Sequence, residues 1–137
     1  PVNAYVADFI GSANVIPVAI ARTEVGVAAS DITRIRYQLA GQALSGVQGS
    51  PQLGPNGALI ARPEDLTLLA PAPQVPNTLA GWVLRRQYLG FKTAYRVQLQ
   101  NGPEIRVELR SGNTVAAFHA GDSVQVLLPA DSRVVSA

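Results

Sequence analysis

Two alternating runs on either side of Asn101-Gly102 constrain the fold of this chain most strongly. Apolar residues occupy every second position over 95–99 and again over 105–109, and charged or amide side chains lie between them. A period of two is the side-chain period of a strand with one buried face. Asn-Gly favours a two-residue turn between antiparallel strands. The sequence therefore predicts a β-hairpin over 93–110 with one buried and one solvated face.

Most of the remaining chain consists of short apolar runs separated by glycine, proline and other turn residues. Further strands are predicted over 15–21, 32–39, 57–61, 79–89, 123–128 and 133–135. The Gly- and Pro-rich segment 41–56 is predicted to form loops or hairpin tips. This spacing indicates a mostly-β small barrel or sandwich rather than a βαβ fold. The proline-rich connector 70–76 would then join two lobes, about 13–69 and 77–137, of one domain spanning 13–137.

The first twelve residues have a different pattern. Apolar residues recur there at helical spacing before Gly11, namely Val2, Tyr5, Val6, Phe9 and Ile10. We expect a short helix and a hinge over 1–12, with Phe9 and Ile10 as interface candidates. The chain starts at Pro1 and has no methionine, so we expect it to be a domain cut from a longer polypeptide or a processed product.

Composition excludes several kinds of site. The 137 residues include no cysteine, so disulfides and thiolate metal sites are excluded, and a 47% hydrophobic content suits a packed core. No apolar stretch approaches the roughly 20 residues of a membrane-spanning helix. The net charge is +2, and the ten arginines are spread along the chain instead of forming a cluster. Nucleic acid is therefore not an expected partner.

No catalytic or metal-binding constellation is present in the sequence. His119 is the only histidine and is interpreted as a surface loop residue. Pro63 suits the first position of a helical turn, where Glu64 and Asp65 would favour the free backbone amides, with Arg62 paired to one carboxylate. No glycine-rich loop precedes a helix to hold a phosphate group. Catalytic, cofactor-binding and metal-binding residues are all predicted to be absent.

One basic doublet, Arg85-Arg86, lies in the predicted strand 79–89. Strand alternation sends its two side chains to opposite faces, so one of them is placed to reach an anion or an acidic partner. The aromatic residues nearby fit the core alternation, and we expect no aromatic face for oligonucleotides; these are Trp82, Tyr88, Phe91 and Tyr95.

Several short blocks, in their order and spacing, resemble a known domain family. They are Phe9-Ile10-Gly11-Ser12-Ala13-Asn14, Ile60-Ala61-Arg62-Pro63-Glu64-Asp65-Leu66, Gly81-Trp82-Val83, Tyr88-Leu89-Gly90 and Gly121-Asp122-Ser123-Val124. The second block has Ala61 where glycine or isoleucine is more usual. The series resembles the TOBE domain, an accessory β-domain of ATP-binding-cassette (ABC) transporter ATPases of the maltose, polyamine and ferric-iron importer type.

The resemblance implies an oligomer-binding (OB)-fold-like barrel with an additional β-layer and a short N-terminal helix. It implies a non-catalytic regulatory and dimerisation domain, with ATP and Mg²⁺ held in a missing nucleotide-binding domain of a transport ATPase. The implied partners are that nucleotide-binding domain, a second copy of the subunit and a membrane permease, and the location is cytoplasmic, at the inner membrane. Structural or regulatory candidates are Arg62, Pro63, Glu64, Asp65, Gly81, Tyr88 and Gly90; interface candidates are Phe9, Ile10, Arg85 and Arg86.

The first two blocks favour an iron or polyamine importer over a maltose importer. The alternative from another class is a free-standing β-barrel module that binds a small oxyanion or an oligonucleotide. An enzyme would need a catalytic constellation that the sequence does not supply.

Overall fold

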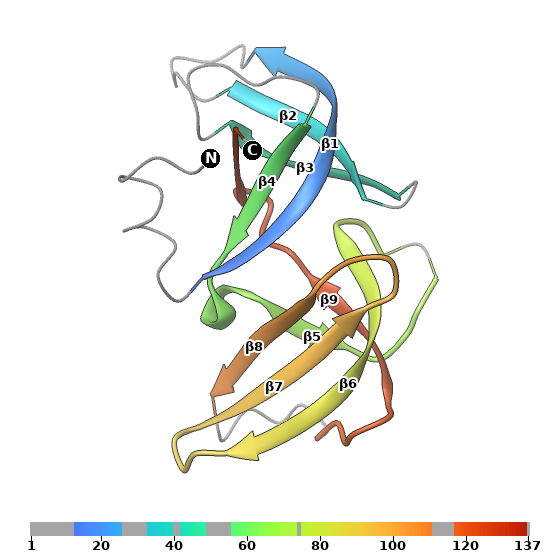
Figure 1. The fold of residues 1–137 in the computed structure, drawn as a ribbon, viewed down its shortest axis with the longest axis vertical. Helices are drawn as coiled ribbons and strands as arrows, with labels where there is room; N and C mark the ends of the chain where they lie inside the picture. The colour runs from blue at the N-terminus through green and yellow to red at the C-terminus, as the bar shows by residue number, and fades with distance from the viewer. Residues whose placement is uncertain are drawn as a thin grey trace. The chain divides into compact units, whose positions relative to one another are not determined.

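The computed structural model describes residues 13–25, 33–39, 42–48, 56–73, 75–110 and 117–136. These residues form a series of strands and one 3₁₀ turn (Figure 1): β1 (Asn14–Val25), β2 (Thr33–Leu39), β3 (Gln42–Gln48), β4 (Asn56–Ala61), η1 (Pro63–Asp65), β5 (Thr67–Leu69), β6 (Thr78–Tyr88), β7 (Lys92–Leu99), β8 (Glu104–Arg110), β9 (Ser123–Leu127) and β10 (Arg133–Ser136). The chain divides into two compact units, Pro1–Ala61 with Pro129–Ala137, and Arg62–Leu128.

The first unit is a closed barrel with the strand order β1-β2-β3-β10-β4. Its strands pair antiparallel, except that β10 runs parallel to β3. Alternation along β1 buries Ile16 and Val18 and leaves Val15 partly exposed. Opposite them, Leu59 of β4 and Val134 of β10 are fully buried. The barrel is therefore closed around an aliphatic core.

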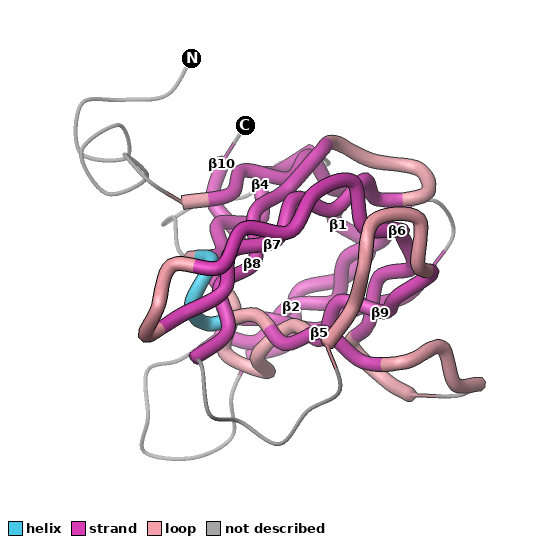
Figure 2. The backbone as a smooth tube through the Cα atoms, turned by 90° about the horizontal axis from the view of Figure 1, so that it is seen from below, coloured by secondary structure: helices cyan, strands magenta, loops and turns pink. Residues whose placement is uncertain are grey.

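The second unit is a five-stranded antiparallel sheet with the order β5-β9-β6-β7-β8. Its buried face is lined by aliphatic side chains from every strand, including Leu68, Val83, Val97, Val107 and Val126. The turn η1, cyan in Figure 2, packs beside β8, and β5 also approaches β8. The sheet therefore curls, so that its two edge strands come close together, as in an OB-fold-like half-barrel.

The two units exchange one strand each. In chain order, β1–β5 make a first set of five strands and β6–β10 a second set. The barrel, however, takes β10 as its fifth strand, and the sheet takes β5. β10 pairs antiparallel with β4, the fourth strand of the first set. β5 pairs antiparallel with β9, the fourth strand of the second set. The units therefore differ from the expected lobes 13–69 and 77–137. β5 precedes the connector 70–76 in the sequence but belongs to the second unit.

The predicted hairpin 93–110 is confirmed as β7 and β8. Tyr95, Val97 and Val107 are buried, while Arg96 and Arg106 on the other face are exposed. The connection is longer than two residues, since the last hydrogen bond runs from the Leu99 N–H to the Pro103 carbonyl oxygen. Proline has no N–H to return that bond, so pairing stops there. The hairpin itself and its two faces are as predicted.

The prediction for segment 41–56 was wrong, and segment 1–12 lies outside the described residues. The stretch 41–56 contains β3, which pairs with β2 over six positions and with β10. Backbone pairing on both sides of β3 outweighs the weak strand preference of its glycine and serine. The helix expected over 1–12, with Phe9 and Ile10, lies outside the described residues.

Candidate functional site

The segment Arg62–Leu66 forms the predicted helical turn after β4. Pro63 is buried at its first position, and the Asp65 N–H donates to the Arg62 carbonyl oxygen at 3.0 Å. Glu64 and Asp65 are exposed in the first turn, where the free amides favour negative charge. The pairing of Arg62 with one of these carboxylates stays a prediction. The turn directs the chain from β4 to β5, which is a structural role.

The two predicted glycines are required for different reasons. A Cβ on Gly81 in β6 would lie 2.5 Å from the carbonyl oxygen of Gln98 in β7, so any side chain would push the two strands apart. Gly90 has open space around it but a φ of +86°, which L-residues rarely adopt. Gly90 therefore permits the tight turn from β6 to β7, which the Leu89 N–H closes on the Lys92 carbonyl oxygen at 2.8 Å.

The β6–β7 turn carries exposed aromatic side chains. Tyr88 is 67% exposed and Phe91 74%, and the Lys92 Nζ lies 5.5 Å from the Phe91 ring centroid. Trp82 is 40% exposed, and of the four nearby aromatics only Tyr95, at 3%, is in the core. The expectation that all four are core residues was wrong for three of them. Trp82 lies between the buried Gly81 and Val83 and so faces outward, and Tyr88 and Phe91 lie at the end of β6 and in the turn after it.

A shallow groove brings two predicted residues together in the second unit. It is lined by Glu64 of η1, by Gly90, Phe91 and Lys92 of the β6–β7 turn, and by Glu108, Leu109 and Arg110 of β8. Its charges are mixed in sign, so the groove favours neither an anion nor a cation.

The Arg85-Arg86 doublet lies just after an irregularity in the β6–β7 register, between Val83 and Arg85. Beyond it, Arg85 is opposite Arg96, while Arg86 is opposite the buried Tyr95. The two arginines therefore lie on opposite faces, as predicted. Arg96 is in turn opposite Arg106 of β8. We call Arg85, Arg96 and Arg106 the arginine row; it crosses three adjacent strands on the outer face of the second unit.

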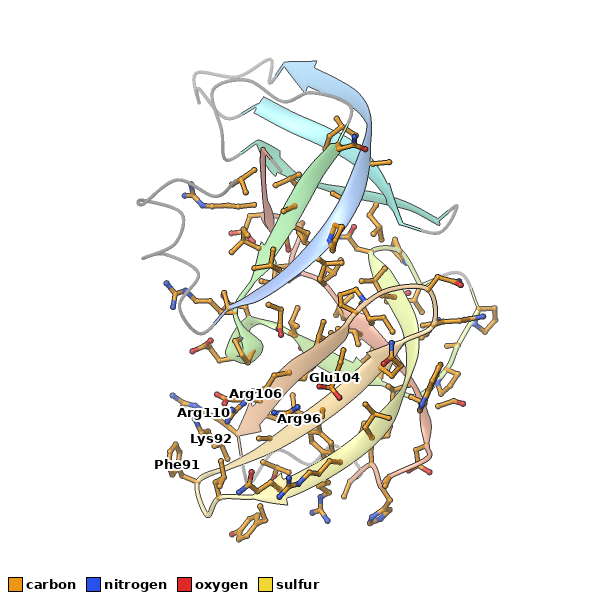
Figure 3. The ribbon with its side chains drawn as sticks, viewed as in Figure 1. Phe91, Lys92, Arg96, Glu104, Arg106 and Arg110 are labelled. Carbon is orange, nitrogen blue, oxygen red and sulfur yellow. The ribbon has the colours of Figure 1, made fainter. Side chains whose placement is uncertain are left out.

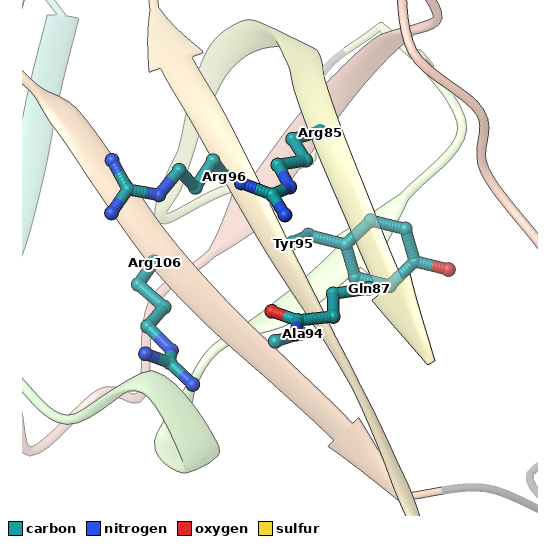
Figure 4. Close-up of a pocket in the computed structure, with 6 residues that line it drawn as sticks. All are labelled: Arg85, Gln87, Ala94, Tyr95, Arg96 and Arg106. Carbon is teal, nitrogen blue, oxygen red and sulfur yellow. The ribbon is translucent and has the colours of Figure 1, made fainter. Parts of the chain in front are cut away.

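The arginine row borders a small hollow of about 90 Å³, which is also lined by Gln87, Ala94 and Tyr95. Figure 4 shows Arg85 and Gln87 extending from β6 across β7, and Arg96 extending from β7 across β8. Ala94 lies opposite Gln87 and Glu108 in the register. Its methyl group is the smallest side chain of this set, which leaves room above the middle strand.

Two carboxylates of β8 pair with cations of this face. Arg96 Nη1 lies 2.8 Å from Glu104 Oε2, and Figure 3 labels both residues. Arg106 Nη2 lies 2.8 Å from Glu108 Oε2. Glu108 also accepts from Lys92 Nζ at 3.0 Å. Arg85 and Gln87 have no such side-chain partner among the described residues.

The described residues that line the hollow beside the arginine row include no histidine, serine or carboxylate. His119 is exposed, and its backbone N–H donates to Asp122 Oδ2 at 2.8 Å, which fits the interpretation as a surface loop histidine. The described residues contain no group of three or more His, Asp or Glu side chains arranged to hold a metal ion. They also contain no helix that is both long and apolar enough to cross a membrane.

Of the residues around the hollow, Arg85 is an interface candidate from the sequence, whereas Gln87, Arg96 and Arg106 are not predicted as site residues. Alternation does place Arg96 and Arg106 on the solvated face of their hairpin. The missing information was the β6–β7 register, which adds Arg85 to the same row.

Comparison with known families gives the identity of the fold. A family model described as the TOBE domain matches residues 59–135, more than half of the chain. This chain belongs to the TOBE domain family. The match runs from the end of β4 through the whole second unit to β10, so this TOBE domain includes both exchanged strands.

Curated relatives of this TOBE domain are ATP-binding proteins of importers. The chain is 33% identical over 132 residues to the spermidine/putrescine import ATP-binding protein PotA of Nitrosomonas europaea, covering 92% of this chain and 35% of that protein. It is 29% identical over 102 residues to the Fe(3+) ions import ATP-binding protein FbpC of Brucella abortus, covering 74% of this chain and 26% of that protein. The TOBE domain chain thus spans about a quarter to a third of the length of these relatives.

A solved structure has the same fold. The cytoplasmic molybdate-binding protein ModG, in a form with molybdate bound, superposes with a TM-score of 0.69 over 88% of this chain and 92% of that one. The sequence identity is 15%, so the likeness concerns the fold of the TOBE domain alone.

Proposed function

We propose that this chain is an accessory, non-catalytic domain of an ABC importer ATP-binding subunit, where it supports dimerisation and receives regulatory signals. The observation that carries the proposal is the match to about a third of an import ATP-binding protein, over 92% of this chain. ATP and Mg²⁺ would be bound by the remaining two thirds of such a subunit. The relatives favour a polyamine or a ferric-iron importer.

The proposed partners follow from that architecture. They are the nucleotide-binding domain of the same subunit, a second copy of the subunit and, through the complex, a membrane permease on the cytoplasmic side of the inner membrane. The exposed Tyr88 and Phe91 suit a protein partner, because aromatic side chains are enriched in protein–protein interfaces. Phe9, Ile10 and Arg86 stay interface candidates under this proposal.

The first test is ATP hydrolysis by the purified 137-residue chain. We expect no turnover above a control without protein, because the chain has no glycine-rich loop preceding a helix and no Mg²⁺-binding carboxylate beside one. Turnover that elutes together with the chain from a size-exclusion column would contradict the proposal.

The second test uses the full-length subunit and a truncation that ends before Pro1. Light scattering should show weaker dimerisation of the truncation, since the scaffold is lost. The dependence of its ATP hydrolysis on protein concentration should change accordingly. A full-length Phe91→Ser variant tests the aromatic turn, with Val15→Ser of the other unit as the matched control. The proposal is wrong if the truncation dimerises and hydrolyses ATP with unchanged concentration dependence and unchanged response to the transported substrate.

A further inference from the structure

The sequence contains two Asn-Gly pairs, and the structure places them in different surroundings. Asn56-Gly57 begins β4, whereas Asn101-Gly102 lies in the connection from β7 to β8. In such a pair the backbone nitrogen of the glycine can attack the side-chain amide carbon of the asparagine, because glycine has no side chain to hinder the approach. The two pairs therefore share one chemistry, and the fold decides which of them reacts.

The attack converts asparagine with no reactant other than water. A bond forms from the glycine nitrogen to the asparagine Cγ, the Cγ–Nδ2 bond breaks, and the proton of the glycine nitrogen leaves with the amide as ammonia. Water then opens the succinimide ring at either of its carbonyl groups, which gives aspartate or isoaspartate, and nothing is oxidised or reduced. The reaction needs a glycine N–H that is not held in a hydrogen bond and a side-chain amide that is free to turn toward it.

Both reacting groups of Asn101-Gly102 are free. Asn101 is exposed, and neither its side chain nor the Gly102 N–H has a hydrogen-bond partner among the described residues. The hydrogen bonds of this connection are made by other atoms. The Leu99 N–H donates to the Pro103 carbonyl oxygen at 3.3 Å, and the Gln98 amide donates to the Gly102 carbonyl oxygen at 2.8 Å. The two reacting groups can therefore approach each other while the sheet stays paired.

The pair Asn56-Gly57 is held by strands on both sides. Gly57 is buried and lies opposite Val18 of β1 and Ser136 of β10. A Cβ on Gly57 would lie 3.0 Å from each of three neighbouring atoms, so little space remains for a side chain to turn toward its nitrogen. Ring closure there requires β4 to leave the barrel first, and such local opening costs free energy. This pair is therefore protected in the folded chain.

We propose that Asn101 is a site of spontaneous covalent modification, at which the Gly102 nitrogen converts the asparagine into aspartate and isoaspartate. Either product lowers the formal net charge of +2 by one. Isoaspartate also adds one methylene group to the backbone between Leu99 and Pro103, whose hydrogen bond closes the connection. The exposed end of the β7–β8 hairpin thus changes in charge and in backbone length as the protein ages. The inference does not depend on the proposed transport role.

The experiment is an incubation of the folded 137-residue chain in mildly alkaline buffer, followed by digestion with trypsin and mass spectrometry. Trypsin cleaves after arginine, so Asn101 is the only asparagine of the peptide 97–106, and Asn56 lies in a different peptide. We expect Asn101 to be converted about a hundredfold faster than Asn56. Fragment spectra should show both aspartate and isoaspartate at position 101. A sample digested without incubation corrects for conversion during the digestion.

The chain unfolded in urea is the matched control, because it keeps the sequence and removes the surroundings. There the two asparagines should react at rates within about threefold of each other, since both precede glycine. Folding should slow Asn56 about a hundredfold and Asn101 by less than about tenfold. Both rates should rise with pH, because the glycine nitrogen attacks after it loses its proton.

Three variants separate the chemistry from the fold. Gly102→Ala should slow conversion of Asn101 about tenfold, because a methyl group hinders the attack. Gly102 is not among the described glycines with a positive φ, so alanine suits its backbone. Gly57→Ala makes the same change at the protected pair and should leave the Asn101 rate unchanged. Asn101→Asp should elute from an ion-exchange column with one of the two products of the parent chain.

Three outcomes would overturn the inference. They are equal conversion of Asn56 and Asn101 in the folded chain, slowing of Asn101 on folding by as much as Asn56, and an unchanged Asn101 rate in Gly102→Ala. The first two would show that the β7–β8 connection does not expose the pair, and the third that the glycine nitrogen is not the nucleophile. Failure of this test leaves the proposed transport role standing, because ATP hydrolysis and dimerisation of the subunit are measured separately.

Discussion

The two units each have an arginine just after a break in the register of their first strand. The first unit is the barrel of β1–β4 with β10, and the second is the sheet of β6–β9 with β5. The register breaks between Ile20 and Arg22 in β1, and between Val83 and Arg85 in β6. In both units the arginine then pairs with an arginine of the next strand, Arg36 in β2 or Arg96 in β7. The two units therefore share a strand order and a register feature.

The units differ on their third strand. Arg36 pairs with Ser45 of β3 in the barrel, whereas Arg96 pairs with Arg106 of β8 in the sheet. At this position of the register the barrel has Arg22, Arg36 and Ser45, and the sheet has Arg85, Arg96 and Arg106. The shared plan accounts for the fold, and the third arginine concentrates the positive charge in the second unit.

The largest expected effect tests which unit the strand β5 stabilises. Leu68 is fully buried in β5, so Leu68→Ala should lower the free energy of unfolding by roughly 2–5 kcal/mol in urea melts. Its neighbour Leu69 is only partly buried, and Leu69→Ala should cost less than about 1 kcal/mol. Hydrogen exchange in Leu68→Ala should accelerate first in β6–β9. Acceleration confined to β1–β4 would break the comparison, because β5 would then belong to the first unit.

A smaller effect compares one glycine from each unit. Gly81→Ala forces a Cβ against the backbone of β7 and should cost about 2–3 kcal/mol. In the barrel, a Cβ on Gly57 would lie 3.0 Å from side chains of Ile20 and Val134 and from the Val135 carbonyl oxygen. The two side chains can yield, so Gly57→Ala should cost about 1 kcal/mol. Thermal melts of the two variants decide the order, and a larger loss for Gly57→Ala would contradict the strand spacing of the second unit.

The smallest effect is expected for the variant that removes the difference between the two units at this position of the register. Arg106→Ser gives the sheet the residue that the barrel has at this position, Ser45. We expect the free energy of unfolding to change by less than about 0.5 kcal/mol, since an exposed ion pair and a like-charge contact are lost together. Added salt should stabilise the parent chain more than the variant, because salt screens the repulsion along the row. A loss above about 2 kcal/mol would show that Arg106 holds the sheet together.

Local patterns predicted the parts of this structure that depend on neighbouring residues. The faces of the 93–110 hairpin follow from strict alternation, and the turn at Pro63 follows from a proline with two acidic residues after it. The strand β3 was missed because its glycine and serine weaken the apolar signal. Its stability comes from pairing on both sides, which the sequence of β3 does not encode.

The strand exchange and the arginine row depend on pairing between distant segments. Nothing local in Thr67–Leu69 indicates that it pairs with Ser123–Leu127 instead of closing the first barrel. Arg85 joins Arg96 only because the register shifts after Val83, and a shift of one residue would have placed Arg86 there. Tyr88 and Phe91 are exposed at the end of β6 and in the turn to β7, and the sequence alone did not place that end.

The exchange of β5 and β10 between two matched units is the central structural claim, and backbone nuclear Overhauser effects test it most directly. The account predicts cross-strand contacts between Leu68 and Val126, in an antiparallel pattern, and between Arg133 and Val47, in a parallel pattern. It is contradicted if the contacts of β5 lead to β3 and β4 and those of β10 to β8 and β9, because each set of five strands would then close on itself.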